Sequence, residues 1–192
     1  MEKTGNKIRA FVAVEISSEA KNEIERIIKY LKTSKIEAKW VDPAVMHGTL
    51  KFLGSVEIEN IYNIAFRMRD ILSKMDPFKI SLSAIGTFPE NKHPRAVWVG
   101  IDDKKRVMEK LHIEINKLIK EEGIISENRT FKPHITLCRI KNPKNTPRLI
   151  ELIEAVNVLP AVSFISEIVI FRSDLSPEGA VHTPLCKIPL GK

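Results

Sequence analysis

Short segments in which apolar and polar residues alternate recur along the chain, and segments with helical periodicity lie between them. Alternation with a period of two is typical of half-buried strands, and apolar residues three and four apart are typical of amphipathic helices. The pattern predicts strands at residues 8–16, 39–41, 48–53, 78–88, 95–101, 134–140, 162–171 and 180–188. It predicts helices at residues 59–73, 104–121 and 147–156, and a first helix that begins near residue 19.

Turn signals separate these elements. Gly54 is expected to end the third strand, and polar turns at residues 91–94 and 173–179 are expected to join two pairs of strands. Strands and helices intermix with hairpins, which favours the α+β class over a purely parallel sheet. No low-complexity linker divides the chain, so we expect residues 1–192 to form a single domain.

One short motif occurs twice. Residues 47–50 and residues 134–137 both read His-x-Thr-Leu, and both lie in predicted strands. The chain has five His, and two such matches by chance have odds on the order of 1 in 10,000. Because side chains alternate along a strand, the His and the Thr of each motif point to the same face. A two-lobed fold would therefore bring two His, each beside a hydroxyl, to either side of a cleft.

Two histidines of this kind suit phosphoester cleavage. Imidazole titrates near neutral pH, so one His can act as a base while the other acts as an acid. The hydroxyls of Thr49 and Thr136 can donate hydrogen bonds to phosphoryl oxygens, and no metal ion is required. A single His-x-Thr is most simply a strand residue with a satisfied hydrogen bond, and the repetition favours a functional site.

Composition adds a preference for an anionic partner. The 192 residues carry a net charge of +7, which favours nucleic acid, although a solvated Lys/Glu surface gives the same balance. No apolar run is long enough for a membrane span, and the N-terminus lacks the core of a signal peptide, so we expect a cytoplasmic protein. The two cysteines, Cys138 and Cys186, are expected to be free.

Other kinds of site have less support. Zinc could be bound by the two motif His and a third ligand from His93, His112, His182 or a carboxylate, but no metal-ligand spacing is present. A Gly-x-Ser-x-Gly nucleophile motif, a phosphate loop and a dinucleotide fingerprint are all absent from the sequence. We therefore expect no metal and no cofactor.

The blocks that surround both motifs resemble the 2H phosphoesterases, and within them the RNA 2′,3′-cyclic phosphodiesterases, also called 2′-5′ RNA ligases. The first motif continues as HGTLKFLG and the second stands in FKPHITLCR. The resemblance covers nearly the whole chain, through residues 9–14, 47–54, 86–89, 94–100, 131–139 and 175–180. It departs at Met46, Gly48, Cys138 and His182, where the family commonly has Asn, a β-branched residue, a small residue and Tyr.

The resemblance implies two pseudo-symmetric lobes of antiparallel-rich sheet, with outer helices, around a central cleft. It implies metal-free hydrolysis of RNA 2′,3′-cyclic phosphate ends to 2′-phosphomonoesters. His47 would be the proton donor, His134 the proton acceptor, and Arg139 a phosphate or RNA contact. It also implies, as the reverse reaction, ATP-independent joining of tRNA halves through a 2′-5′ linkage. The partners would be RNA molecules with 2′,3′-cyclic phosphate ends. Apart from the resemblance, we expect a monomer that binds no membrane, since no feature of the sequence argues otherwise.

Further residues are candidates for substrate binding. Lys51 is expected to share a face with Thr49, Arg95 follows a loop near the expected cleft, and Phe11 is a candidate base platform, although core packing also suits it. His182 is a candidate for reaching the substrate. We expect Trp40 and Trp98 to be core residues, and His93 and His112 to face solvent.

Two other functions remain open at this point. A non-catalytic protein that binds RNA ends would use the same His only to hold phosphate. A metal-dependent phosphohydrolase would use them as ligands. Intact His and Thr in both motifs favour the catalytic hypothesis over simple binding.

Overall fold

The computed structural model describes residues 7–90, 93–124, 130–175 and 180–191. Their order along the chain is β1 (Lys7–Glu15), α1 (Ser18–Lys32), β2 (Glu37–Trp40), the 3-10 helix η1 (Pro43–Val45), β3 (His47–Glu57), α2 (Ile58–Leu72), β4 (Phe78–Phe88), β5 (Ala96–Asp102), α3 (Val107–Glu121), β6 (His134–Asn142), α4 (Thr146–Ala155), β7 (Val162–Ile165), β8 (Glu167–Leu175) and β9 (Ala180–Pro189).

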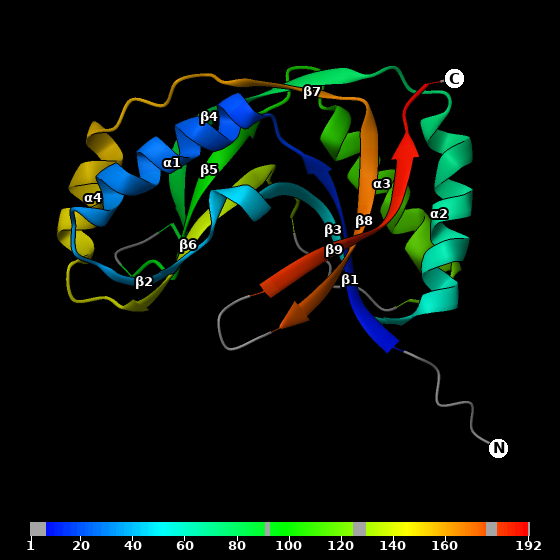
Figure 1. Ribbon diagram of the computed structural model, residues 1–192, viewed down its shortest axis with the longest axis horizontal. Coiled ribbons are helices and arrows are strands. Elements are labelled where there is room, and N and C mark those ends of the chain that lie inside the picture. The colour runs from blue at the N-terminus through cyan, green and yellow to red at the C-terminus, as the bar shows by residue number, and fades with distance from the viewer. Residues whose placement is uncertain (1–6, 91–92, 125–129, 176–179, 192) are drawn as a thin grey trace.

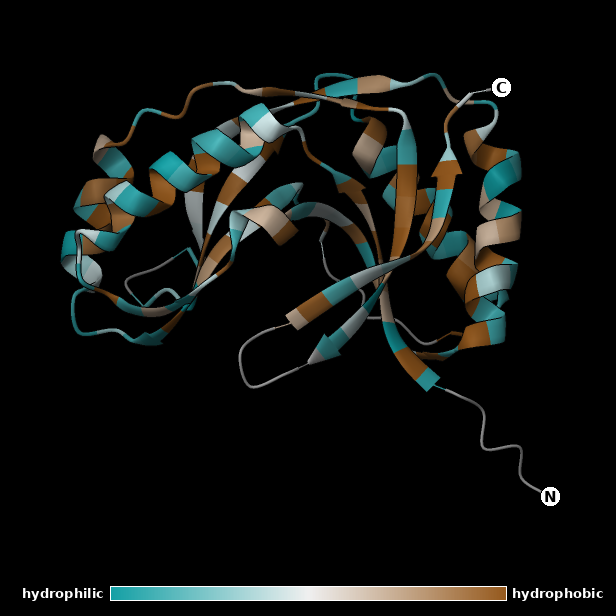
Figure 2. Ribbon diagram, in the orientation of Figure 1, coloured by the Kyte–Doolittle hydropathy of each residue, from teal (hydrophilic) through white to brown (hydrophobic). Residues whose placement is uncertain are grey.

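The strands form two sheets with helices outside them. The first sheet has the order β3-β1-β8-β9, the second has the order β2-β6-β5-β4-β7, and neighbouring strands are antiparallel. Helices α2 and α3 lie at one end of the molecule and α1 and α4 at the other, with the sheets between them (Figure 1). Brown, apolar residues of the helices face the sheets and teal ones face outward (Figure 2). The α+β class and the two lobes are confirmed.

The two lobes exchange helices. Strand β1 belongs to the first sheet, but the following helix α1 contacts β7 of the second. Strand β5 belongs to the second sheet, but the following helix α3 contacts β3 of the first. One continuous apolar cluster therefore includes residues of both sheets. A helix that leaves one lobe to cover the other buries apolar surface on both, which ties the lobes together.

Both motif strands carry the same bulge. In the first sheet Ala13 is opposite Thr49 and Val12 is opposite Lys51, so Leu50 has no cross-strand partner. In the second sheet Trp98 is opposite Thr136 and Val97 is opposite Cys138, so Leu137 is skipped in the same way. A bulge inserts one residue, bends the strand and re-aims the side chains beside it. The repeat in sequence is thus also a repeat in backbone geometry.

Two predicted boundaries were wrong. Residues 162–171 form two strands in different sheets, because the chain leaves the second sheet at Ser166 and joins the first as β8. Only the two polar residues Ser166 and Glu167 separate the apolar residues of β7 from those of β8, and neither Gly nor Pro marks the break, so the pattern does not reveal the change of sheet. The third strand continues past Gly54 to Glu57. Gly54 has φ 77° where the β1–β3 register shifts, a backbone conformation that suits glycine, so it bends the strand without ending it.

The expected hairpin of residues 78–88 and 95–101 is present as β4 and β5. Parts of the two predicted polar turns, residues 91–92 and 176–179, lie outside the described residues. Among the described helices, none is long and apolar enough to cross a membrane.

A pair of serines joins the two chain segments that pass between the lobes. Ser17 caps α1 by accepting a hydrogen bond from the Ala20 amide at 3.2 Å, and its hydroxyl donates to the Val162 carbonyl at 3.0 Å. The Ser17 amide donates to the hydroxyl of Ser163 at 3.0 Å, and Ser163 is only 2% exposed. The junction after β1 is therefore fixed to β7 by polar contacts.

Replacing Ser163 by Ala should lower the free energy of unfolding by about 1–3 kcal/mol, because the Ser17 amide loses its buried acceptor. Chemical denaturation of both proteins measures this difference. Ser166→Ala is the matched control, since Ser166 is exposed and lies on the same segment. Equal destabilisation by the two substitutions would contradict the role given to Ser163.

Candidate active site

The ring of His47 is held from three sides. Its Nδ1 lies 3.0 Å from the main-chain oxygen of Val45, in the 3-10 helix just before the strand. Its face stacks on Phe11, with ring centres 4.6 Å apart and planes at 25°. The ring of His182 from β9 meets it nearly at right angles, at 5.1 Å. These contacts fix both the position and the rotation of the imidazole.

His134 has an equivalent hydrogen bond in the second lobe. Its Nδ1 lies 2.6 Å from the main-chain oxygen of Lys132, again two residues earlier in the chain. The rings of Phe88 and Trp98 approach it at 5.0 and 6.0 Å, with interplanar angles of 83° and 66°. Each motif histidine is thus bonded to a carbonyl at the same spacing and packed against aromatic rings.

The hydrogen bond at Nδ1 determines the chemistry of the other ring nitrogen. A carbonyl oxygen only accepts, so Nδ1 of His47 and of His134 must carry the proton. In a neutral ring Nε2 then keeps its lone pair, and in a charged ring Nε2 carries the proton that can be donated. Both histidines therefore present Nε2 as the group able to accept or donate a proton.

The two motif strands, β3 of the first sheet and β6 of the second, lie close to each other. β3 and β6 contain residue pairs whose Cα atoms lie within 8 Å. Thr49 and Thr136 are half-buried, as are both motif histidines, and the residues between them, Gly48 and Ile135, are buried. The expected arrangement of His and Thr on one face of each strand is present.

Burial makes the charged form of these histidines unfavourable. The pKa of His47 is lowered to about 4, mainly by burial and in part by the charges of His182 and Lys21, while the bond to Val45 and the charge of Glu15 act in the opposite direction. Burial also lowers the pKa of His134, helped by the ammonium of Lys132 and opposed by the bond to the Lys132 carbonyl. Both rings are accordingly neutral at pH 7 before an anion binds.

After the bulge in each motif strand, the first side chain is buried and the second is exposed. Lys51, expected beside Thr49, is only 6% exposed, whereas the following Phe52 is 65% exposed and its ring lies 5.9 Å from that of Phe11. In the second motif Cys138 is buried and Arg139 is exposed, opposite Lys39 of β2 and Ala96 of β5. Phe52 and Arg139 thus occupy equivalent positions, each five residues after a motif histidine. The expectation that Lys51 shares a face with Thr49 was wrong, because Thr49 is opposite Ala13 whereas Lys51 is opposite the adjacent Val12.

Phe11 contacts a motif histidine through its side chain, whereas Arg95 contacts a motif strand through its main chain. Phe11 is 2% exposed and belongs to a small apolar cluster with Ala13, Val169 and Phe171, on which His47 rests. It supports the histidine and offers little free surface to a base. Arg95 is exposed at the start of β5, where its main-chain oxygen accepts a hydrogen bond from Ile140 of the motif strand at 2.9 Å.

Trp98 is a buried residue, as expected, but it also borders the site. A Cβ on Gly86 would lie 2.2 Å from its Cζ2 atom, so the indole covers that glycine closely. Lys132 places its ammonium 4.3 Å from the centre of the indole ring and pairs with Glu90. No sequence pattern indicates this packing, because Gly86 and Trp98 meet only through the β4–β5 register.

Two other histidines lie close to the motif strands. His182 contacts His47, burial lowers its pKa, and its Nδ1 is buried with no hydrogen-bond partner among the described residues. His112 was expected to face solvent, and this was wrong: its ring is half-buried and hydrogen-bonded to the main chain of β3. Its helix is charged on its outer face, but the histidine lies on the side toward the sheet.

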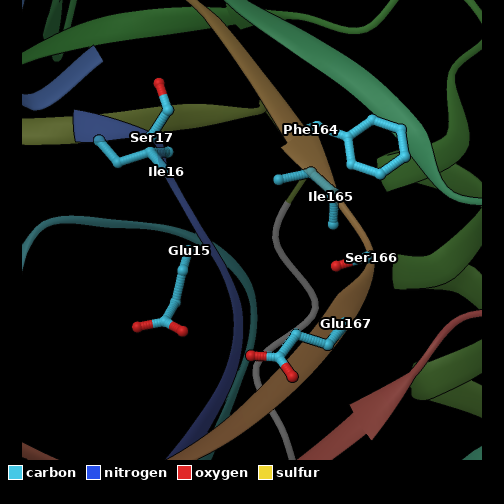
Figure 3. A pocket seen from close by; sticks show the side chains of 7 residues that line it. All are labelled: Glu15, Ile16, Ser17, Phe164, Ile165, Ser166 and Glu167. Atoms are coloured by element: carbon cyan, nitrogen blue, oxygen red, sulfur yellow. The ribbon is translucent and has the colours of Figure 1, made fainter. Parts of the chain in front are cut away.

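A separate hollow of about 190 Å³ opens where the chain passes between the lobes, lined by residues 15–17 and 164–167 (Figure 3). Two carboxylates, those of Glu15 and Glu167, line it, and Lys187 bridges them at 3.1 and 2.9 Å. Acidic walls repel phosphate, so we do not place an anionic substrate there. In the described part of the chain, no group of three or more His, Cys, Asp or Glu could hold a metal ion.

Comparison with known proteins identifies the class. The LigT-like phosphoesterase family matches the chain twice, at residues 14–98 and 99–182, so each half carries its own match. An RNA 2′,3′-cyclic phosphodiesterase of Methanothermobacter thermautotrophicus is 34% identical and covers 93% of this chain and 97% of its own length. One of Aquifex aeolicus is 32% identical and covers 96% of this chain and 98% of its own length.

Solved structures agree with the fold. The protein TT0787 of Thermus thermophilus superposes with a TM-score of 0.75 at 27% identity, over 96% of this chain and all of that one. The LigT of E. coli complexed with 3′-AMP gives a TM-score of 0.75 at 23% identity, over 97% of this chain and 100% of that one. The chain belongs to the LigT-like phosphoesterase family, which confirms the resemblance seen in its sequence.

Gly86→Ala should displace the Trp98 indole, because the new methyl group would overlap it, and should cost about 1–3 kcal/mol of stability. The His134 ring packs on that indole, so its Cε1–H resonance should shift in NMR spectra. Gly48→Ala is the matched control in the other lobe, where the nearest atom, Ile101 Cδ1 at 2.9 Å, ends a flexible side chain. An unchanged His134 resonance in Gly86→Ala would contradict this packing.

Proposed function

We propose that this protein hydrolyses RNA ends that carry a 2′,3′-cyclic phosphate and releases 2′-phosphomonoesters, without a metal ion. One observation carries the proposal: both motif histidines bond Nδ1 to a carbonyl and so present Nε2 for proton transfer, from two strands that approach each other. The names of the relatives support the substrate class. The positive net charge of +7 suits a polyanion.

The reaction needs one base and one acid. Neutral His134 accepts a proton at Nε2 from water while the water oxygen forms a bond to phosphorus. The bond between phosphorus and the 3′ oxygen breaks, and that oxygen takes the proton from Nε2 of protonated His47. The hydroxyls of Thr49 and Thr136 donate hydrogen bonds to the phosphoryl oxygens. With an RNA 5′-hydroxyl in place of water, the same steps give a 2′-5′ linkage, and tRNA halves would be the partners.

The surroundings of the two histidines support different roles. Lys132 places a positive charge near His134, which favours the neutral ring that a base requires. His47 has Glu15 opposite it in the β1–β3 register, and this carboxylate favours the charged ring that an acid requires, whereas His182 and Lys21 oppose that charge. The buried His47 is nevertheless neutral in the free protein, so the substrate phosphate must supply the charge that lets it take up a proton.

Residues outside the motifs take supporting roles in this proposal. Arg139 is exposed on the motif strand and would neutralise the phosphate or the adjoining RNA, and Arg95 lies on the neighbouring strand end. Phe11 would hold His47 in place through ring stacking. We leave Lys51 out of the site because its side chain is buried.

Turnover of a short RNA with a 2′,3′-cyclic phosphate, assayed in EDTA, tests the proposal. His47→Ala and His134→Ala should each reduce kcat by roughly 10²- to 10⁴-fold, the usual contribution of a positioned acid or base. His93→Ala is the control, because this exposed histidine lies in a loop. Absence of turnover by the wild type would contradict the function, and turnover that survives both substitutions would contradict the site. Loss of turnover in EDTA with recovery on adding zinc would favour the metal-dependent alternative.

An anion at Nε2 should raise the pKa of His47 above its free value of about 4, because the anion stabilises the imidazolium that burial disfavours. Between the free and the bound pKa, anion binding then takes up a proton, so affinity should increase as the pH falls. NMR titration of the Cε1–H signals with and without sulfate measures this shift, and sulfate does not itself titrate in this range. His93 provides the internal control, and an unshifted His47 would contradict the proposal.

A further inference from the structure

His112 of α3 contacts residues near both motif histidines. Its Nδ1 lies 2.7 Å from the main-chain oxygen of Leu50 in β3, and its Nε2 lies 2.8 Å from Nδ2 of Asn116 one helical turn later. Its ring stacks on Phe131, with centres 4.4 Å apart and planes at 15°. One side chain therefore touches the strand of the first motif and the segment that leads into the second.

The hydrogen bonds define which nitrogen of this ring carries the hydrogen. The Leu50 carbonyl only accepts, so Nδ1 of His112 donates to it. In the neutral ring Nε2 is then an acceptor and receives the amide hydrogen of Asn116. With a partner at each nitrogen and an aromatic ring against its face, the imidazole has a single orientation.

Leu50 is the residue that the bulge leaves without a cross-strand partner. β3 is also the edge strand of its sheet, so no further strand is present among the described residues to satisfy its carbonyl. A bulge that re-aims neighbouring side chains depends on the partner of its extra residue. His112 supplies that partner next to Thr49, and so holds the bulge of the first motif.

Phe131 is next to Lys132, whose carbonyl accepts the Nδ1 hydrogen of His134. Residues 130–133 belong to no helix or strand, so side-chain contacts must keep that carbonyl in place. The stack of His112 on Phe131 is one of these side-chain contacts, and a main-chain hydrogen bond from the Ile101 amide to the Pro133 oxygen at 3.1 Å also holds the segment. His112 thereby acts on the second motif as well.

We infer that His112 is a positioning residue that links the two His-x-Thr motifs, through its bond to the Leu50 carbonyl and its stack on Phe131. It does not touch the reacting phosphate. The inference rests on the proposed function for its effect on turnover, whereas its effect on the motif histidines is measurable without any substrate.

Three variants separate the two contacts. His112→Phe keeps an aromatic ring against Phe131 but removes the donor to Leu50. Phe131→Leu removes the aromatic stack and keeps the hydrogen bond. Ile113→Ala is the control, since Ile113 is the neighbouring residue on the same helix and is 48% exposed. NMR titration of the Cε1–H signals of His47 and His134, unfolding by denaturant, and kcat and KM are measured for each.

His112→Phe should move the titration of His47 by on the order of half a unit, Phe131→Leu should do the same for His134, and Ile113→Ala should move neither. Each of the first two should lower kcat by roughly tenfold or more, because the general acid or the general base is misplaced. KM should change little in Phe131→Leu, which keeps the bond that holds the bulge beside Thr49. If His112→Phe does not fold, His112→Gln, which keeps a donor but loses the ring, should follow Phe131→Leu.

Loss of stability with both titrations and kcat unchanged would show that His112 is merely structural, and would overturn the inference. Absence of turnover in the wild type contradicts the proposed function alone. The titrations of His47 and His134 then still decide whether His112 positions them.

Discussion

The hydrogen bond from Nδ1 of each motif histidine to a carbonyl two residues earlier is the constraint on which the site depends. It assigns the ring proton, because a carbonyl cannot donate, and it leaves Nε2 as the group for chemistry. Both acceptors precede the motif strand, in the 3-10 helix before β3 and in the segment before β6. The elements that hold these carbonyls are therefore as important to the site as the histidines themselves.

Repetition of backbone geometry gives two similar sites, and the packing around them makes the sites different. The same bulge at Leu50 and Leu137 places His and Thr alike in both lobes. His47 then rests on an apolar cluster built around Phe11, whereas His134 borders Trp98 and the ammonium of Lys132. Because each lobe is covered by a helix from the other half of the chain, neither site is built by one half alone.

The sequence predicted the elements and the paired motifs well, since both depend on local periodicity and on a repeated tetrapeptide. It did not predict the change of sheet at Ser166, because only two polar residues interrupt the apolar stretch there and only long-range pairing decides which sheet a strand joins. It also missed the bulges, which bury Lys51 and expose Phe52. The packing of Trp98 on Gly86 and the bond of His112 to Leu50 depend on residues brought together only by the fold.

A crystal structure with a nucleoside 2′,3′-cyclic vanadate, which mimics the five-coordinate transition state, is the sharpest test of the two-histidine site. We predict that Nε2 of His47 and Nε2 of His134 each lie within hydrogen-bond distance of a vanadate oxygen, with both Nδ1 atoms still bonded to the carbonyls of Val45 and Lys132. The hydroxyls of Thr49 and Thr136 should contact the remaining oxygens. Vanadate bound through only one histidine, or a ring turned so that Nδ1 faces the vanadate, would contradict the assignment of both histidines to proton transfer.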